Sequence, residues 1–361
     1  MTINIKTISL EDLGYSAFFE SNRKAQALGH NPVARVIAEY KEAYRVKDAT
    51  SEYLAKITGK QMFKASSRED YPAVGDWVAI SKLDAELAVI HSVLPRKTIL
   101  KRKYSSKFES QIIATNIDTA FIIESVDRDY NLNRFERYLA IANDGKIASA
   151  IVLNKMDLIS ESELNVKISQ LKDRFHGIEV IPTSTLSDNG YSKLAAHIKK
   201  GETYCFLGSS GVGKSTLINR LLGENSIKTA SISYHTGRGK HTTSSREMYF
   251  LENGGMVIDN PGMRQIGMTD SSSGIDNVFD EIIDLSPKCK FIDCTHAHEP
   301  GCAVRAAVEA GIVDESKYSN YMKLKKETEY FEMTKLEKRK KDRQFGKFVK
   351  KAQDQMKDSK F

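Results

Sequence analysis

Apolar side chains in the first hundred residues come mostly in short runs that polar segments separate. Residues 1–31 carry only a weak apolar stripe, which predicts one helix followed by a loop. Five β-like runs follow, and they predict strands at residues 34–38, 43–46, 53–57, 77–80 and 88–90. Strands this short and this closely spaced predict a small barrel of the OB type. Such a barrel either contacts nucleic acid or only docks on a neighbouring domain.

The next segment, residues 96–107, has a different character. It contains six basic side chains in twelve positions, and we expect a linker or an exposed loop there. Two interpretations stay open for its charge. The segment either adds to an RNA-facing surface or is merely solvated.

From about residue 112 apolar strands alternate with helical segments. The strands are expected at residues 119–124, 148–153, 179–181, 204–207, 247–251 and 256–258. Helical patterns fall at residues 133–144, 161–175, 191–199 and 216–222. This alternation predicts a mostly parallel sheet covered by helices, and long helical stretches continue from about residue 270 to the end.

The pattern divides the chain into three predicted domains. We expect an N-terminal helix plus OB-fold barrel at 1–108, an α/β domain at 109–268 and a mostly helical domain at 269–361. Only 4 cysteines occur in 361 residues, which excludes a disulfide scaffold. No apolar run approaches the ~18–20 residues of a membrane span, and the first residues lack a signal-peptide pattern. We therefore expect a soluble, cytoplasmic protein with no membrane partner.

The basic excess of the chain is concentrated at its end. The formal net charge is +7, and residues 317–361 hold 15 Lys and Arg against 7 Asp and Glu, which leaves the remainder near neutral. A basic tail on a neutral body predicts attraction to a polyanion such as RNA or DNA. The alternative is a solvated helix face, since many helices are rich in Lys and Glu.

One motif predicts a phosphate-binding loop. Residues 208–215 match G-x-x-x-x-G-K-[ST] at every fixed position, with an apolar strand before them and a helix after them. Lys214 is expected to reach the β- and γ-phosphates, and the Ser215 hydroxyl to bind Mg²⁺. Cys205, in the preceding strand, is expected to be packed in the core. The predicted phosphate-binding residues are Gly208, Ser209, Ser210, Gly211, Val212, Gly213, Lys214, Ser215 and Thr216.

A second motif indicates which base is bound. The string Asn154-Lys155-Met156-Asp157 follows the predicted strand 148–153. The Asp157 carboxylate can accept two hydrogen bonds from guanine, whereas adenine offers no such pair of donors. Asn154 is expected to bond N7, and the Lys155 stem to cover the base. Ser184 and Thr185 are weaker candidates for contacts to guanine O6. GTP and GDP are the predicted nucleotides.

Two further segments fit the γ-phosphate side of such a site. Asp259-Asn260-Pro261-Gly262 matches D-x-x-G, in which the Asp holds Mg²⁺ through water and the Gly N–H meets the γ-phosphate. Thr243, beside Thr242 in a basic glycine-rich segment, is the candidate for a hydroxyl ligand to Mg²⁺.

The order of these motifs is unusual. The base motif at residue 154 precedes the phosphate loop at residue 208, whereas common GTPases have the reverse order. A circular permutation preserves a site that depends on positions in space. It also leads the segment after Gly262 directly into the last domain. We infer that the nucleotide state could reposition that domain.

A cysteine and histidine cluster predicts a structural zinc site. Its spacing is Cys289-x4-Cys294-x-His296-x5-Cys302, and three thiolates with one imidazole form a closed tetrahedral set. No position remains for a catalytic water. His298 is the competing histidine, and free cysteines in a helical hairpin are the alternative.

Taken together, the chain resembles the circularly permuted, small-ribosomal-subunit-dependent GTPases of the RsgA/YjeQ family. The resemblance rests on the motifs above, on Gly237-Arg-Gly-Lys-His-Thr-Thr243, and on residues 289–304. It extends from about residue 32 to the basic tail. It implies an N-terminal OB-fold, a permuted GTPase domain and a C-terminal zinc domain. It also implies late maturation of the small ribosomal subunit, contacts to ribosomal RNA, and hydrolysis that the subunit stimulates.

The predicted reaction is attack of water on the γ-phosphate, with Mg²⁺ and Lys214 neutralising charge. Ras-like enzymes have a water-orienting Gln after D-x-x-G, and Met263 stands there in this chain, so intrinsic turnover should be slow. His241 is the family-like candidate for orienting the water, while contact with RNA is the alternative for this side chain. With Lys214 and Thr243 it completes the predicted catalytic set. Ser244 and Asn260 replace common threonines of the family, and Ser244 leaves open which hydroxyl meets Mg²⁺.

Two functions remain in competition. One is a monomeric GTP-hydrolysing assembly factor, and the other is a nucleotide-controlled RNA-docking protein with vestigial hydrolysis. Stimulation of turnover by small subunits distinguishes them. An ATP-dependent kinase is disfavoured because Asp157 selects guanine.

Overall fold

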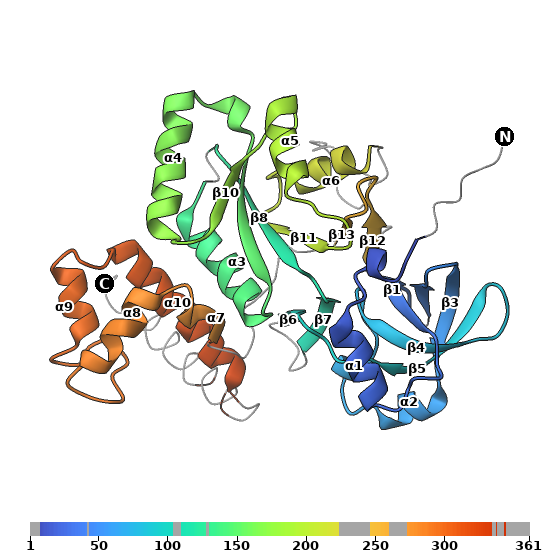
Figure 1. Ribbon diagram of the computed structural model, residues 1–361. Helices are drawn as coiled ribbons and strands as arrows, with labels where there is room; N and C mark the ends of the chain where they lie inside the picture. The colour runs from blue at the N-terminus through green and yellow to red at the C-terminus, as the bar shows by residue number, and fades with distance from the viewer. Residues whose placement is uncertain are drawn as a thin grey trace, which may run out of the picture.

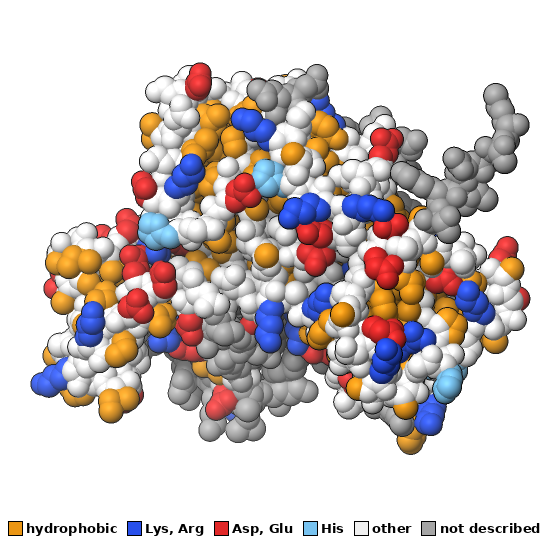
Figure 2. Space-filling model, in the orientation of Figure 1, with side chains coloured by type: hydrophobic (Ala, Val, Ile, Leu, Met, Phe, Trp, Pro, Cys, Tyr) orange, Lys and Arg blue, Asp and Glu red, His pale blue; other side chains and the backbone are white. Residues whose placement is uncertain are grey.

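The computed structural model describes residues 8–41, 43–103, 110–127, 130–223, 246–259 and 273–333, together with residues 337 and 343. Figure 1 shows three parts in a row: a small barrel, a central sheet with helices on both faces, and a helical end. On the face drawn in Figure 2, acidic and basic side chains lie interspersed over the described surface. This mixture agrees with the near-neutral charge of the chain outside the tail.

The predicted barrel is confirmed. Its strands run in the order β1-β2-β3-β5-β4, and antiparallel pairing of β1 with β4 closes it. The interior holds alternate side chains of these strands, among them Val36, Val46 and Ile80. The bounds are β1 (Val33–Glu39), β2 (Tyr44–Lys47), β3 (Glu52–Ile57), β4 (Trp77–Lys82) and β5 (Leu87–Val93), with α2 (Gly59–Lys64) between β3 and β4.

A short helix covers one side of the barrel, as the weak apolar stripe predicts. Helix α1 (Ala17–Ala25) buries Phe19, and the ring of Tyr15 meets that of Trp77 edge-on at a centroid distance of 4.8 Å. These three aromatic rings form a separate small core together with Leu13, Val33 and Leu94. The N-terminal helix is therefore part of the barrel unit.

The central sheet is mostly parallel, as predicted. Its strand order is β10-β9-β8-β11-β13-β12, and only β12 runs antiparallel to its neighbour. Side chains alternate between two cores: one contains α3 and α4, and the other contains α5 and α6. The strands are β8 (Thr119–Ser125), β9 (Ala148–Asn154), β10 (Glu179–Pro182), β11 (Thr203–Gly208), β12 (Arg246–Phe250) and β13 (Met256–Asp259). The helices are α3 (Leu132–Asp144), α4 (Glu161–Arg174), α5 (Asp188–Ala196) and α6 (Lys214–Leu222).

Helix α5 begins three residues before its predicted start. The Ser187 hydroxyl accepts a hydrogen bond from the Gly190 N–H and so caps the helix at that point. The apolar pattern places the start at Tyr191, because the first turn carries polar residues.

The prediction of a linker or exposed loop at 96–107 is wrong for residues 99–103. Residues Ile99–Lys103 form strand β6, which pairs antiparallel with β7 (Ser110–Thr115). Leu100 is fully buried within the core of the central domain. The sequence analysis missed this strand because its apolar pair, Ile99 and Leu100, lies among six basic side chains. Residues 104–107 lie outside the described part of the chain.

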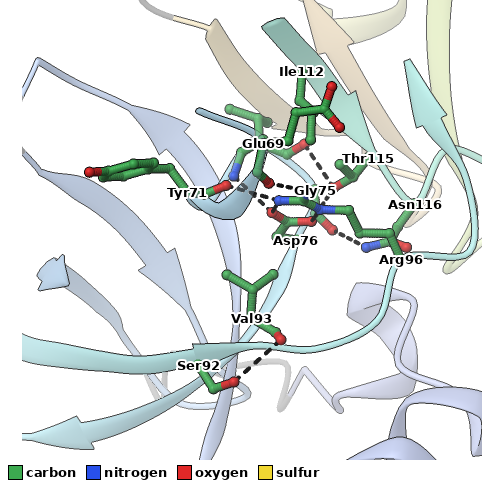
Figure 3. Close-up of polar contacts among 12 residues, drawn as sticks. Glu69, Tyr71, Gly75, Asp76, Ser92, Val93, Arg96, Ile112, Thr115 and Asn116 are labelled. Carbon is green, nitrogen blue, oxygen red and sulfur yellow. Dashed lines mark hydrogen bonds and ion pairs between the residues drawn. The ribbon is translucent and has the colours of Figure 1, made fainter. Parts of the chain in front are cut away.

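A buried polar cluster joins the barrel to β7 (Figure 3). The Arg96 guanidinium donates to both oxygens of Asp76, at 2.8 and 2.7 Å, and the Thr115 hydroxyl donates to the same carboxylate at 2.7 Å. The neighbouring Gly75 has a φ of +97°, and a Cβ atom there would lie 2.0 Å from the Thr115 carbonyl oxygen. Only glycine fits at this close approach.

Arg35 makes a second buried connection at the same joint. Its guanidinium donates to three backbone carbonyls, including that of Asn116 at 3.0 Å, and lies over the Trp77 ring. Burial lowers the pKa of Arg35 to about 10, and the Asp118 and Asp76 carboxylates oppose this shift. The side chain is therefore still charged at neutral pH.

The barrel and the central sheet also share main-chain hydrogen bonds. Strand β1 pairs with β12 at Ala38 and Glu39, so the barrel strands continue the central sheet. Arg246, the first residue of β12, forms an ion pair with Glu39 at 3.0 Å. The two parts therefore meet through backbone pairing as well as side chains.

The C-terminal part is helical, as predicted, and it packs on the α3 face of the sheet. Phe279, Tyr321 and Leu324 belong to the same core as Phe135 and Leu139 of α3. The bounds are α7 (Ser273–Asp276), α8 (Asp280–Leu285), α9 (Ala303–Glu309) and α10 (Glu315–Glu332). Among the described helices, none is both long and apolar enough to cross a bilayer.

Candidate nucleotide site and metal centre

The predicted phosphate loop connects strand β11 to helix α6. Gly208 ends the fully buried strand with a φ of +151°, and a Cβ atom there would lie 2.1 Å from the Ile123 carbonyl oxygen. Gly213 precedes the first helical residue with a φ of +99°. Both positions therefore require glycine. The loop ends at the N-terminus of α6, where backbone N–H groups attract phosphate.

Lys214 lies over this loop. Its ammonium donates to the Gly208 carbonyl at 2.7 Å and also to the Ser209 carbonyl. These contacts hold the charged group at the loop. Ser215 follows in the first turn of α6.

Asp259 ends strand β13, which lies parallel to β11, so it reaches the edge of the sheet that carries the phosphate loop. A hydroxyl and a carboxylate are the hard oxygen ligands that Mg²⁺ prefers, so Ser215 and Asp259 fit the predicted ion.

The base motif is brought to the phosphate loop by strand β9. Asn154 is buried, and its side-chain N–H donates to the Val212 carbonyl at 2.7 Å. A Cβ atom at Gly213 would lie 2.4 Å from the same amide nitrogen. Asn154 therefore ties the base motif to the phosphate loop, a role that the sequence analysis missed.

The two predicted base-recognition segments meet at the end of the sheet. The Ser184 hydroxyl donates to the Asp157 carboxylate, and the Met156 N–H donates to the Thr183 carbonyl at 3.2 Å. Lys155 adopts a left-handed backbone with a φ of 61°, and its ammonium bonds Asp127 at 3.1 Å. The Thr185 carbonyl accepts from Arg220 of α6. These contacts bring residues 154–157 and 184–185 together.

Two acidic residues at this site were not predicted. Glu124, in β8, is fully buried and accepts a hydrogen bond from the Ser209 hydroxyl at 3.0 Å. Burial raises the pKa of Glu124, and the bond from Ser209 opposes the rise. Asp127 is the partner of Lys155. In the sequence, the sign that could have pointed to Glu124 is its position as an acidic residue near the end of the otherwise apolar strand 119–124.

Several predicted residues lie outside the described part of the chain. They are the switch candidates His241, Thr242, Thr243 and Gly262, together with Met263. Their roles remain predictions from the sequence.

The cysteine and histidine cluster is assembled in the C-terminal part. One ligand atom from each of Cys289, Cys294, His296 and Cys302 lies within 4.8 Å of the others. Thiolates and imidazole are the ligands of structural zinc, so the donor set fits Zn²⁺. The competing His298 is exposed and lies outside this set.

His296 is held in one orientation. Its Nδ1 atom lies 3.6 Å from Cys289 Sγ and 3.5 Å from Cys302 Sγ, so Nδ1 faces the thiols and is the ring nitrogen that would bind a metal ion. Its Nε2 atom lies 3.1 Å from the Ser286 hydroxyl, which itself donates to the Ile282 carbonyl at 3.0 Å. The Tyr318 hydroxyl of α10 donates to the His296 carbonyl at 2.7 Å. The cluster therefore connects the end of α8 with α10.

Cys205 is separate from the cluster. It is fully buried in β11, and burial raises the pKa of its thiol to about 12. The expectation of a core cysteine is confirmed.

The fold and this site define a P-loop protein in which the base motif precedes the phosphate loop. The family model described as RsgA GTPase matches residues 93–269. A protein of Lactiplantibacillus plantarum called small ribosomal subunit biogenesis GTPase RsgA 2 is 41% identical over 350 residues, 96% of each chain. The chain therefore belongs to the RsgA GTPase family, and it is a GTP hydrolase.

Other relatives agree with this assignment. A protein of Listeria monocytogenes with the same name is 40% identical over 90% of each chain. The crystal structure of YjeQ from Thermotoga maritima matches with a TM-score of 0.62 and 27% identity, covering 81% of this chain and 96% of that one. YloQ, described as a circularly permuted GTPase, has the same fold with a TM-score of 0.58 and 24% identity over 83% of this chain and 96% of that one. The predicted family and fold class are confirmed.

Proposed function

We propose that this protein binds the small ribosomal subunit in the cytoplasm and hydrolyses GTP to GDP and phosphate late in the maturation of that subunit. The observation that carries the proposal is 41% identity, over 96% of the chain, to a protein whose name states small ribosomal subunit biogenesis. The proposal includes action as a monomer on ribosomal RNA. The basic tail, residues 317–361, supplies a polyanion-binding segment that begins in helix α10.

The nucleotide contacts of this proposal follow from the site. Asp157 accepts from the guanine N1–H and amino groups, while Ser184 orients its carboxylate. Lys214 and the N-terminus of α6 neutralise charge on the phosphates. Mg²⁺, held by Ser215 and Asp259, supplies further charge neutralisation when bound.

The predicted catalytic set lacks a water-orienting side chain at residue 263, directly after the D-x-x-G motif. Met263 has no group to orient a water molecule, so intrinsic turnover is expected to be slow. We assign the water-orienting role to His241 and an Mg²⁺-ligand role to Thr243, with the bound subunit completing the active arrangement. Cys289, Cys294, His296 and Cys302 hold one structural Zn²⁺ in this proposal.

The experiment that tests the proposal measures GTP hydrolysis by the purified protein with and without purified small ribosomal subunits. ATP is the control nucleotide. We expect strong stimulation for GTP only. Tight GTP binding without any stimulation would contradict the proposal and favour a docking protein with vestigial hydrolysis.

A further inference from the structure

A polar pocket lies between helix α3 and helix α10, and the residues that line it belong neither to the base motif nor to the metal cluster. Its volume is about 360 Å³, within the range of small-ligand sites. The two helices belong to the central domain and the C-terminal part, which pack together along this seam (Figure 1). The pocket is lined by Asn131, Asn133, Arg134, Arg137, Ser319, Asn320, Lys323 and Leu324.

The lining is suited to an anion. Its described residues supply three cationic side chains, four neutral polar side chains and one leucine, and no carboxylate. Arg137 is held by two hydrogen bonds of 2.8 and 2.7 Å to Glu327. Lys323 is exposed and forms no ion pair with any residue in the described ranges. The pocket therefore keeps a positive charge that a ligand can use.

The walls of the pocket are fixed by buried contacts. The Asn320 side chain donates to the buried Glu136 carboxylate and, at 3.3 Å, to the Asn133 carbonyl. Arg174 of α4 forms an ion pair with Glu136 at 2.7 Å. These bonds clamp α10 to α3, so the pocket is preorganised.

We propose that this pocket binds a phosphate group of a polynucleotide backbone. Guanidinium, ammonium, amide and hydroxyl donors on the lining match the oxygens of a phosphodiester. The proposal rests on the proposed function for the source of the phosphate, ribosomal RNA. A free phosphate ion carries the same chemistry, and the experiment below distinguishes the two sources.

The pocket is connected to the phosphate loop of the nucleotide site. Arg134 lies 3.7 Å from Oε2 of the buried Glu124, and the Ser209 hydroxyl donates to Oε1 of the same carboxylate. A phosphate that attracts Arg134 weakens its interaction with Glu124. Because Glu124 is buried, this change in charge balance is transmitted to Ser209. Backbone binding in the pocket therefore alters nucleotide affinity.

The first test measures binding of a fluorescein-labelled twelve-nucleotide RNA by anisotropy. Lys323→Gln removes the cation of the pocket that has no ion pair among the described residues, and Lys326→Gln removes an exposed lysine of the same helix that does not line the pocket. We expect Lys323→Gln to weaken RNA binding at least threefold more than Lys326→Gln does. Equal effects of the two variants would overturn the proposal. Thermal unfolding of both variants checks that each is folded.

A calorimetric titration with inorganic phosphate distinguishes a site for RNA from a site for free phosphate. A polynucleotide site predicts a strong effect of Lys323→Gln on RNA and weak phosphate binding. An effect of Lys323→Gln on phosphate binding alone would overturn the RNA assignment and leave a free-anion site. This RNA assay does not need the ribosomal subunit, so failure of subunit stimulation and failure of the pocket are distinguishable.

The second test addresses the connection to the phosphate loop. We expect RNA to change the release rate of a fluorescent GDP analogue at least twofold in the unsubstituted protein. Arg134→Gln should abolish this response, whereas Lys326→Gln should retain it. A full response in Arg134→Gln would refute the link through Glu124.

Discussion

Asp157 and Ser184 come from different loops, yet their side chains are hydrogen-bonded at the end of the central sheet. The Ser184 hydroxyl fixes the carboxylate that the sequence analysis assigns to guanine. In Asp157→Asn one acceptor oxygen becomes an N–H₂ donor, which opposes the guanine amino group and suits the second carbonyl of xanthine.

We expect Asp157→Asn to lower GTP affinity about 100-fold or more and to raise the affinity for xanthosine triphosphate. Equilibrium titration with fluorescent analogues of both nucleotides measures the change. Ser184→Ala is the comparison variant, because it keeps the Asp157 carboxylate and should therefore keep the preference for guanine. Unchanged GTP affinity in Asp157→Asn would contradict the assignment of the base.

The second prediction for a single residue concerns Ser286, which lies beside the metal-cluster residue His296. Its hydroxyl holds the Nε2 side of His296, so the Nδ1 side faces the thiols. Loss of a group that orients a metal ligand typically costs 10–100-fold in metal affinity. We expect Ser286→Ala to weaken Zn²⁺ binding about 10-fold, measured by competition with a chromophoric chelator. Ser286→Thr retains a hydroxyl and should bind Zn²⁺ like the unsubstituted protein. Equal affinity in all three proteins would show that the hydroxyl is not needed.

At the scale of the element, one buried ion pair contributes to the joint between the barrel and β7. Asp76 is fully buried and receives two bonds from Arg96 and one from Thr115. Removal of one partner of a buried pair leaves the other charge without compensation, at a cost of about 3–5 kcal/mol. We expect Arg96→Met to lower the free energy of unfolding by about this amount, measured by urea denaturation.

The double variant Asp76→Leu with Arg96→Met distinguishes this cause from a loss of packing. It removes both charges, so it should be more stable than the single variant. A double variant that is less stable by the sum of both single effects would contradict the ion-pair explanation.

Asp48, in the turn between β2 and β3, is expected to make the stability of the fold depend on pH. Burial opposes ionisation of Asp48, but the Lys82 ammonium and the N–H groups of Ser51 and Thr50 lower its pKa to about 2. Because the folded pKa lies below the unfolded value near 4, the ionised carboxylate stabilises the fold above pH ~4. That contribution disappears as the pH falls from about 4 to about 2.

We therefore expect Asp48→Asn to have a lower melting temperature than the unsubstituted protein at pH 6, and the difference to shrink towards pH 3. Melting curves followed by circular dichroism measure this. Glu52→Gln, which removes a more exposed carboxylate of the same hairpin, is the control. A constant difference across the pH range would exclude the charge of Asp48 as the cause.

The elements also show what the sequence does and does not reveal. Strands with several consecutive apolar residues, such as β8 and β11, were predicted within about one residue at each end. Strand β6 was missed because its pairing partner, not its own composition, makes it a strand. At the site, the motif residues were predicted from fixed spacing. Glu124 and Ser286 were not, because their roles depend on neighbours that only the fold brings close.

At the scale of the whole molecule, the permuted order has a structural consequence. Strand β12 directly follows the segment that holds His241 and Thr243, and it pairs with barrel strand β1. Strand β13, which ends at Asp259, pairs with the other edge of β12. Both segments predicted to meet the γ-phosphate are therefore attached to the same two-stranded unit, and that unit is bonded to the barrel. A movement of the barrel would therefore reach both γ-phosphate segments through β12 and β13.

The basic tail provides the last prediction. Residues 335–361 hold 11 Lys and Arg against 4 Asp and Glu, a net charge equal to the +7 of the whole chain. Each phosphate that a cation neutralises releases counterions and steepens the dependence of binding on salt, by about 0.7 in the log–log slope for single-stranded RNA. A tail that contacts RNA through four or more cations should therefore account for about three units of slope.

Removal of residues 335–361 tests this directly. We expect weaker binding of an RNA oligonucleotide at low salt and a slope that is shallower by about three units, measured by anisotropy from 50 to 300 mM salt. Binding of a fluorescent GDP analogue is the control, because the nucleotide site lies in the central domain. The alternative from the sequence, a solvated helix face, predicts the same slope with and without the tail. An unchanged slope would therefore leave RNA binding to the barrel and to the cations of the α3–α10 pocket.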